Sequence, residues 1–79
     1  MARQDINRAF EMGVFVAVVE TGAFSAAARR LALTPSAVSK LVSRLEARLG
    51  ARLLQRSTRQ LHTTPEGDAF FVQCKRILD

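Results

Sequence analysis

Hydroxyl and cationic side chains recur at helical spacing between residues 34 and 47, where they could hydrogen-bond to a polar partner. An apolar stripe predicts the buried face of a helix and consists of Val38, Leu41, Val42, Leu45 and Leu49. The opposite face consists of Ser36, Ser39, Lys40, Ser43 and Ala47. Short serine side chains allow a helix to lie deep in the major groove of a duplex, where their hydroxyls donate to or accept from base edges. Lys40 is long enough to reach a guanine acceptor or a phosphate.

Positive charge is concentrated around this segment. The 79 residues include 12 Lys and Arg against 7 Asp and Glu, a net charge of +5. Eight of the basic residues but only one acid, Glu46, lie between Arg29 and Arg59, so these 31 residues carry +7. Such segregation is typical of a phosphate-binding surface. Basic amphipathic helices also bind acidic membranes, and charge alone does not separate the two.

Start and stop signals place the polar face on the second helix of a helix-turn-helix. Thr34 and Pro35 supply a capping hydroxyl followed by proline at the first helical position, and Gly50 closes the helix. A shorter helix with Ser25 as its N-cap precedes it, and residues 32–33 form the tight turn. Two strand-like segments, 53–56 and 60–63, then predict a hairpin whose tip carries Arg59, long enough to enter a minor groove.

Two further helices complete the predicted fold. The first has Asp5 or Asn7 as its cap, ends at Gly22, and buries the stripe Met12, Phe15, Val16 and Val19. The last begins at a second threonine-proline signal, 64–65, and is apolar over more than one stripe, which favours packing against a partner's helix as well as its own core. The residues expected at that dimer interface are Phe70, Phe71, Cys74, Ile77 and Leu78.

The sequence disfavours other classes of protein. It has no glycine-rich phosphate loop, paired catalytic carboxylates or triad, so we expect no enzyme and no cofactor. The single histidine, His62, and the single cysteine, Cys74, make no metal site, and one cysteine fits a reducing cytoplasm. The longest apolar run, 14–19, is far shorter than the roughly 20 residues of a membrane span. No apolar signal core follows the first residues.

Several short motifs resemble the start of a LysR-type transcriptional regulator. They are FVAVVETGAFSAAA at 15–28, AVSK at 37–40, LEARLG at 45–50, LLQRSTR at 53–59 and TPEG at 64–67. They follow in order without gaps and cover essentially the whole chain. The resemblance implies a mainly helical fold: a winged helix-turn-helix of three helices and a two-stranded wing over residues 1–63, then the start of a long linker helix at 64–79.

The resemblance also implies partners. Members of this family are bacterial regulators, so we expect a cytoplasmic, nucleoid-associated protein that binds a pseudo-palindromic double-stranded DNA operator. It would form a homodimer through the linker helix, with a tetramer for the full-length parent. A small-molecule effector would bind only through a C-terminal domain that is absent from this chain.

Residue by residue, the resemblance implies DNA contacts on the recognition helix, 34–49, and on the wing. These are Thr34, Pro35, Ser36, Ser39, Lys40, Ser43, Arg56, Thr58 and Arg59. Candidates for phosphate contacts are Arg29, Arg30 and Arg52. Pro35 stands where many relatives have Gln, and Lys40 where Arg is commoner, which removes or weakens bidentate contacts at both positions.

Two other functions remain open at this point. A sequence-neutral architectural DNA-binding protein would share the charge distribution without discriminating between sequences. A helical module that binds proteins or membranes would ignore duplex DNA.

Overall fold

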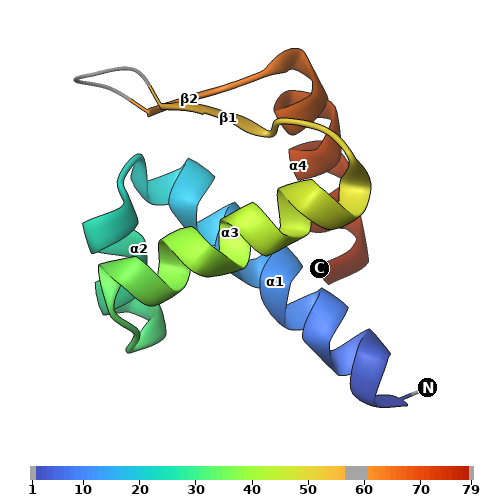
Figure 1. Cartoon of the computed structure of the whole chain (residues 1–79), viewed down its shortest axis with the longest axis horizontal. Helices are drawn as coiled ribbons and strands as arrows, with labels where there is room; N and C mark the ends of the chain where they lie inside the picture. The colour runs from blue at the N-terminus through green and yellow to red at the C-terminus, as the bar shows by residue number, and fades with distance from the viewer. Residues whose placement is uncertain (1, 57–60, 79) are drawn as a thin grey trace.

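The computed structural model describes residues 2–56 and 61–78, and of residues 2–7 the backbone alone. Within these ranges the elements follow in the order α1 (Ala2–Thr21), α2 (Phe24–Leu31), α3 (Pro35–Leu49), β1 (Leu54–Arg56), β2 (Leu61–Thr63) and α4 (Pro65–Leu78). In Figure 1, α3 crosses in front of α1, the hairpin runs along the top toward the side of α2, and α4 lies at the opposite end. The predicted mainly helical class, with a two-stranded wing and a further helix, is confirmed.

Helix α1 begins earlier than expected, at Ala2, so Asp5 and Asn7 lie inside the helix and neither is its cap. No glycine or proline interrupts residues 2–12, and the helical conformation therefore continues to the beginning of the described chain. Its end is as predicted: Gly22 has a φ of 80° and donates its N–H to the Val18 carbonyl at 2.8 Å.

The centre of α1 is buried on all sides rather than along one stripe. Residues 14–18 are all buried, whereas Met12 and Val19 of the predicted stripe are only partly covered. The reason is that α1 packs against α2, α3 and α4. This helix is therefore the axis of the core, and the other helices are positioned on it.

Helix α2 begins at Phe24 with Ala23 as its N-cap, so the prediction of Ser25 as the cap is wrong. The chain is extended at Ala23, directly after Gly22, and the Ala23 carbonyl already accepts from the Ala27 N–H at 3.0 Å. The predicted turn after α2 is confirmed: Ala32 adopts a left-handed conformation with φ of 58°. This turn delivers the chain to the start of α3.

Both threonine-proline signals are confirmed as helix starts. The Thr34 hydroxyl accepts from the Ala37 N–H at 3.1 Å, and the Thr64 hydroxyl accepts from the Gly67 N–H at 2.9 Å. Thr64 also donates its hydroxyl to the Arg52 carbonyl, which connects the first turn of α4 to the segment before the hairpin. The direction in which α4 leaves the hairpin is thereby fixed by side-chain and backbone bonds.

The wing pairs antiparallel, with Leu54 opposite Thr63 and Arg56 opposite Leu61. Its base is anchored by Leu53 and Leu54, which are 1% and 2% exposed and belong to the same core as α1, α2 and α3. Residues 57–60, which include Thr58 and Arg59, lie outside the described residues.

Candidate nucleic-acid interface

The polar face predicted on α3 is formed in the structure. Val38, Val42 and Leu45 are buried on one side of the helix. On the other side the exposed residues are Thr34, Pro35, Ser36, Lys40, Ser43 and Ala47, with Ser39 half-buried at the edge. Because the buried residues fix the rotation of α3, its short hydroxyl side chains and Lys40 are held outward on a rigid surface.

Arg56, the last residue of β1, connects the wing to this face. Its Nη2 donates to the Ser43 hydroxyl at 3.3 Å and lies 4.0 Å from a carboxylate oxygen of Glu46. Its guanidinium carbon lies 5.1 Å from the centre of the Phe24 ring of α2, a cation–π distance. The side chain is 34% exposed. Three groups from two helices thus fix this arginine at the boundary between α3 and the wing.

Glu46 is the residue on which the base of the wing is built. The residue is 8% exposed, and its carboxylate accepts the backbone N–H groups of Leu53 at 2.9 Å and Leu54 at 3.2 Å. The sequence predicts a structural role for Glu46 through pairing with a basic residue, and Arg56 supplies that partner. The backbone bonds were not predicted; the signal is that Glu46 is the one acid within the basic segment.

The other arginines of the basic segment divide into two groups. Arg30 pairs with Glu20 at 2.8 Å, and Arg48 pairs with the buried carboxylate of Glu11, so these two stabilise the packing of helices. Arg29, Arg44 and Arg52 are exposed and take part in no such pair among the described residues. Arg52 lines two adjoining hollows of about 430 and 510 Å³ between the end of α3 and β1, and Arg56 lines the larger one.

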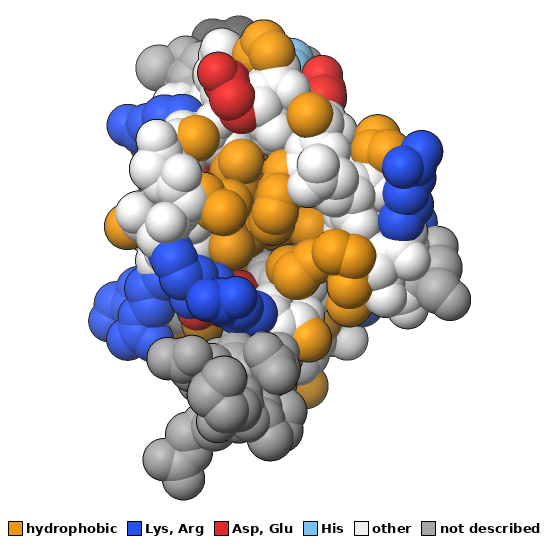
Figure 2. Space-filling model, turned by 90° about the vertical axis from the view of Figure 1, so that its right-hand side faces the viewer, with side chains coloured by type: hydrophobic (Ala, Val, Ile, Leu, Met, Phe, Trp, Pro, Cys, Tyr) orange, Lys and Arg blue, Asp and Glu red, His pale blue; other side chains and the backbone are white. Residues whose placement is uncertain are grey.

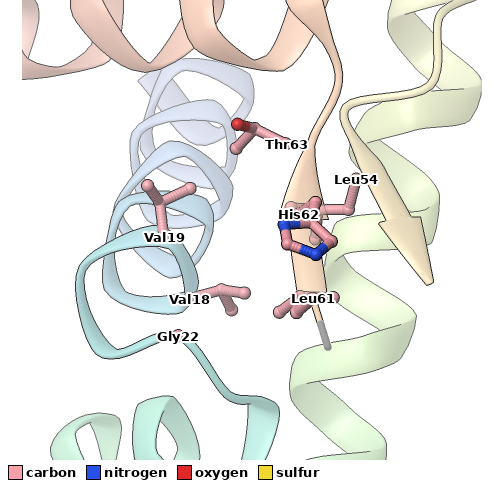
Figure 3. Close-up of a pocket in the computed structure, with 7 residues that line it drawn as sticks. All are labelled: Val18, Val19, Gly22, Leu54, Leu61, His62 and Thr63. Carbon is pink, nitrogen blue, oxygen red and sulfur yellow. The ribbon is translucent and has the colours of Figure 1, made fainter. Parts of the chain in front are cut away.

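A smaller hollow of about 190 Å³ lies between the wing and α1 (Figure 3). Leu54 and Leu61 of the strands lie opposite Val18 of α1, and the His62 ring stands at the rim. Among the described residues no group of His, Cys, Asp and Glu could hold a metal ion.

An apolar surface covers the side of the molecule where α1, α3 and α4 meet (Figure 2). It surrounds a hollow of about 380 Å³ lined by Arg8, Met12, Leu45, Arg48, Leu49, Phe70 and Ile77. Of the residues expected at a dimer interface, Ile77 and Leu78 are 67% and 41% exposed, and Phe70 and Phe71 are half-buried. Leu49, which was predicted on the buried stripe of α3, is instead 44% exposed because the last turn of the helix extends beyond the core, and Val72, which was not predicted, is exposed as well.

Cys74 differs from the other residues of the expected interface because it is completely buried in the core of the chain itself. Burial raises the pKa of its thiol to about 11, so the thiol stays protonated near neutral pH. The Cys74 side chain packs entirely within the chain's own core, so none of its surface is open to a partner. The neighbouring Phe70 ring likewise packs on Phe15, with ring centres 5.7 Å apart.

Comparison with known proteins identifies relatives of this arrangement. Residues 11–68 match the family described as "Bacterial regulatory helix-turn-helix protein, lysR family". The HTH-type transcriptional regulator CrgA of Neisseria meningitidis serogroup B is 56% identical over 68 residues, which are 86% of this chain and 23% of CrgA. The HTH-type transcriptional activator AaeR of Escherichia coli K12 is 44% identical over 73 residues, 92% of this chain and 24% of AaeR. The chain thus spans about a quarter of the length of these relatives.

Solved structures show the same fold. The BenM_DBD/benA site 1 DNA complex superimposes with a TM-score of 0.85 at 37% identity, covering 89% of this chain and 79% of that one. The CbnR_DBD-DNA complex has a TM-score of 0.85 at 38% identity, covering 89% and 80%. In the described part of the chain, none of the helices has both the length and the apolar character needed to cross a bilayer.

Proposed function

This chain belongs to the LysR family of bacterial regulatory helix-turn-helix proteins, and we propose that it is the part of a transcriptional regulator that recognises a specific sequence of double-stranded DNA. The relatives are named as transcriptional regulators, which are not enzymes, in line with the expectation from the sequence. Two structures of the same fold, both more than a third identical in sequence, are complexes with DNA. Both the family and its solved relatives therefore support binding of double-stranded DNA by this domain.

Recognition of base sequence is supported by the exposed face of α3. Short hydroxyl side chains and one lysine project from a helix whose other side is locked into the core. We assign α3 to the major groove, with base or phosphate contacts from Thr34, Pro35, Ser36, Ser39, Lys40 and Ser43. The wing adds Arg56, and the sequence adds Thr58 and Arg59 for the adjacent minor groove. Arg29, Arg30 and Arg52 remain candidates for phosphate contacts, Arg30 from a side chain that is 50% exposed beside its ion pair with Glu20.

The exposed side chains of α4 support dimerisation through residues 64–79. Ile77, Leu78 and Val72 leave large apolar surface in water, which a second copy would cover. A two-fold dimer presents two α3 helices and therefore fits a pseudo-palindromic operator. An effector-binding domain and a tetramer are proposed for the longer parent protein.

Selection of bound duplexes from a random pool, with light scattering in the same buffer, tests the proposal. We expect enrichment of an inverted repeat with A·T-rich flanks and the mass of a dimer. Binding with the same salt dependence but without enrichment would instead indicate a sequence-neutral architectural protein. If a monomer enriched a single half-site, the proposed recognition of bases would stand and the proposed dimer would be overturned.

A further inference from the structure

Ser43 and Arg56 form a unit that neither residue would form alone. They come from α3 and β1, 13 positions apart, and the guanidinium donates to the serine oxygen at 3.3 Å. Glu46 and the Phe24 ring hold the guanidinium from its other sides. Ser43 is exposed on the face of α3 that we assign to DNA.

The bond from Arg56 biases the hydrogen-bonding role that remains for the Ser43 hydroxyl. A serine hydroxyl has one donor and two acceptor positions, and the guanidinium occupies one acceptor position. In the described part of the chain the hydroxyl hydrogen is donated to no acceptor. The neighbouring positive charge strengthens the hydroxyl as a donor and repels any other N–H donor that approaches it.

We infer that Ser43 and Arg56 together form a site that favours an acceptor atom of DNA and disfavours a donor in the same place. The inference rests on the proposed function. The acceptor is either a base-edge atom, such as guanine O6 or N7 or thymine O4, or a phosphate oxygen. The exocyclic amino groups of cytosine and adenine are disfavoured at this site. Ser43 is a specificity-determining residue if the acceptor lies on a base.

Glu46 and Phe24 act through Arg56 and are positioning residues. Without the carboxylate and the ring, the guanidinium would be free to move from Ser43 into solvent. Glu46 is itself fixed by the backbone N–H groups of Leu53 and Leu54, so the position of Arg56 is set by the fold of the hairpin base.

A double-mutant cycle tests the inference in the 79-residue protein. Affinities of Ser43→Ala, Arg56→Ala and the double variant are measured by fluorescence anisotropy on the enriched duplex and on its single base-pair substitutions. We expect each single change to weaken binding about fivefold, and the double variant to lose much less than the product of the two. Ser43→Thr keeps the hydroxyl and should retain most of the affinity. Arg76→Ala, an exposed arginine on α4, controls for the loss of one positive charge.

The pattern across duplexes identifies the acceptor. Loss of discrimination at one base pair of each half-site supports a base-edge atom, whereas an equal loss on all duplexes supports a phosphate. Single changes that multiply in the double variant, or a Ser43→Ala protein within about twofold of the wild type, would overturn the inference. The wild-type protein would still enrich its operator in that event, so the proposed function is tested separately.

Glu46→Gln tests the positioning role. The amide oxygen still accepts the two backbone N–H groups, so the midpoint of thermal unfolding should fall by less than about 5 °C. The coupling between Ser43 and Arg56 should nevertheless shrink because the carboxylate charge is gone. Unchanged coupling would contradict a role for Glu46 in holding Arg56.

Discussion

Gly67 packs against the backbone so closely that its lack of a side chain is required. A Cβ atom there would lie 2.0 Å from the Leu53 carbonyl oxygen, in the segment that leads into β1. Such a Cβ would clash with backbone atoms of Leu53, and no change of side-chain rotamer could relieve the clash. The first turn of α4 and the base of the wing can therefore approach each other only with glycine at this position.

Gly67→Ala should accordingly lower the free energy of unfolding by about 1–3 kcal/mol, or more if the wing is displaced. Gly13→Ala is the matched control, because a Cβ at position 13 meets nothing within 4 Å. It lies inside α1, where alanine should stabilise by roughly 0.5–1 kcal/mol. Urea unfolding of both variants measures the difference, and equal effects would contradict the close approach.

The ion pair between Arg48 and Glu11 leads to a second prediction for single residues. The Glu11 side chain is 7% exposed and that of Arg48 is 39% exposed. Arg48→Ala leaves a buried carboxylate without its partner and should cost about 1–3 kcal/mol of stability in chemical denaturation. Replacing both residues by apolar ones, as in Arg48→Leu with Glu11→Leu, should recover most of the loss. A double variant as unstable as the single one would show that the pair itself stabilises the fold.

At the tip of the wing, Arg59→Ala tests a residue assigned from the sequence. We expect weaker binding and a relaxed preference for A·T pairs in the flanks, since a narrow minor groove attracts a guanidinium. Selection from a random pool with each protein measures this preference. Arg76→Ala removes the same charge from α4 and should leave the flanks unchanged. Unaltered affinity of Arg59→Ala at low salt would remove Arg59 from the interface.

At the scale of elements, local signals predict most of the helix boundaries. Thr34-Pro35 and Thr64-Pro65 each act within one helical turn, and both are found as predicted. Ser25 is not the cap because the extended residue Ala23, directly after Gly22, starts α2 earlier. Ser25 then occupies the second helical position, where serine is equally ordinary. Caps are predictable where cap and proline coincide, and ambiguous where only one polar residue marks the start.

The candidate site is only partly predictable for a different reason. The outward face of α3 follows from its own periodicity, and the structure shows it as expected. The contacts of Arg56 to Phe24, Ser43 and Glu46 join residues up to 32 positions apart and depend on how the hairpin folds back onto α3. Likewise Cys74 and Ile77 lie on one helix, but only the packing of α4 on α1 decides that the first is buried and the second exposed.

The exposed apolar side chains of α4 lead to a prediction about assembly rather than folding. Ile77→Asp places a charge on a side chain that is 67% exposed in one chain, so folding should be nearly unaffected. If a partner covers this side chain, the dissociation constant of the dimer should rise at least about tenfold. Analytical ultracentrifugation measures it, with Gln73→Asp as the control for charge on the same helix. A dimer as tight as the wild type would place the interface elsewhere.

Across the whole molecule, Glu20 links three helices by pairing with Arg30 of α2 at 2.8 Å and with Lys75 of α4 at 3.1 Å. Its hydrogen bond with Arg30, then that with Lys75, holds the pKa of this carboxyl below its ordinary value of 4.5. A carboxyl whose pKa is lower in the folded state contributes stability that is present above the unfolded pKa and lost as the pH falls through the folded one.

Glu20→Gln should therefore reduce stability near neutral pH and have a diminishing effect as the solution becomes more acidic. Urea unfolding between about pH 3 and pH 7 measures the difference from the wild type. Because these side chains are exposed, added salt should reduce the difference at neutral pH. If the difference in unfolding free energy between the two proteins stayed constant with pH, the charge of Glu20 would not be what stabilises the contact.

The connection between the wing and α4 also constrains how two copies of the domain could be arranged. Thr64 and Gly67 join the start of α4 to the residues before β1 through hydrogen bonds and a backbone contact, which leaves no hinge at this point. In a dimer joined through α4, each winged helix-turn-helix would then keep a fixed orientation relative to its own α4. The separation and tilt of the two α3 helices in such a dimer would be set by how the two α4 helices pack against each other.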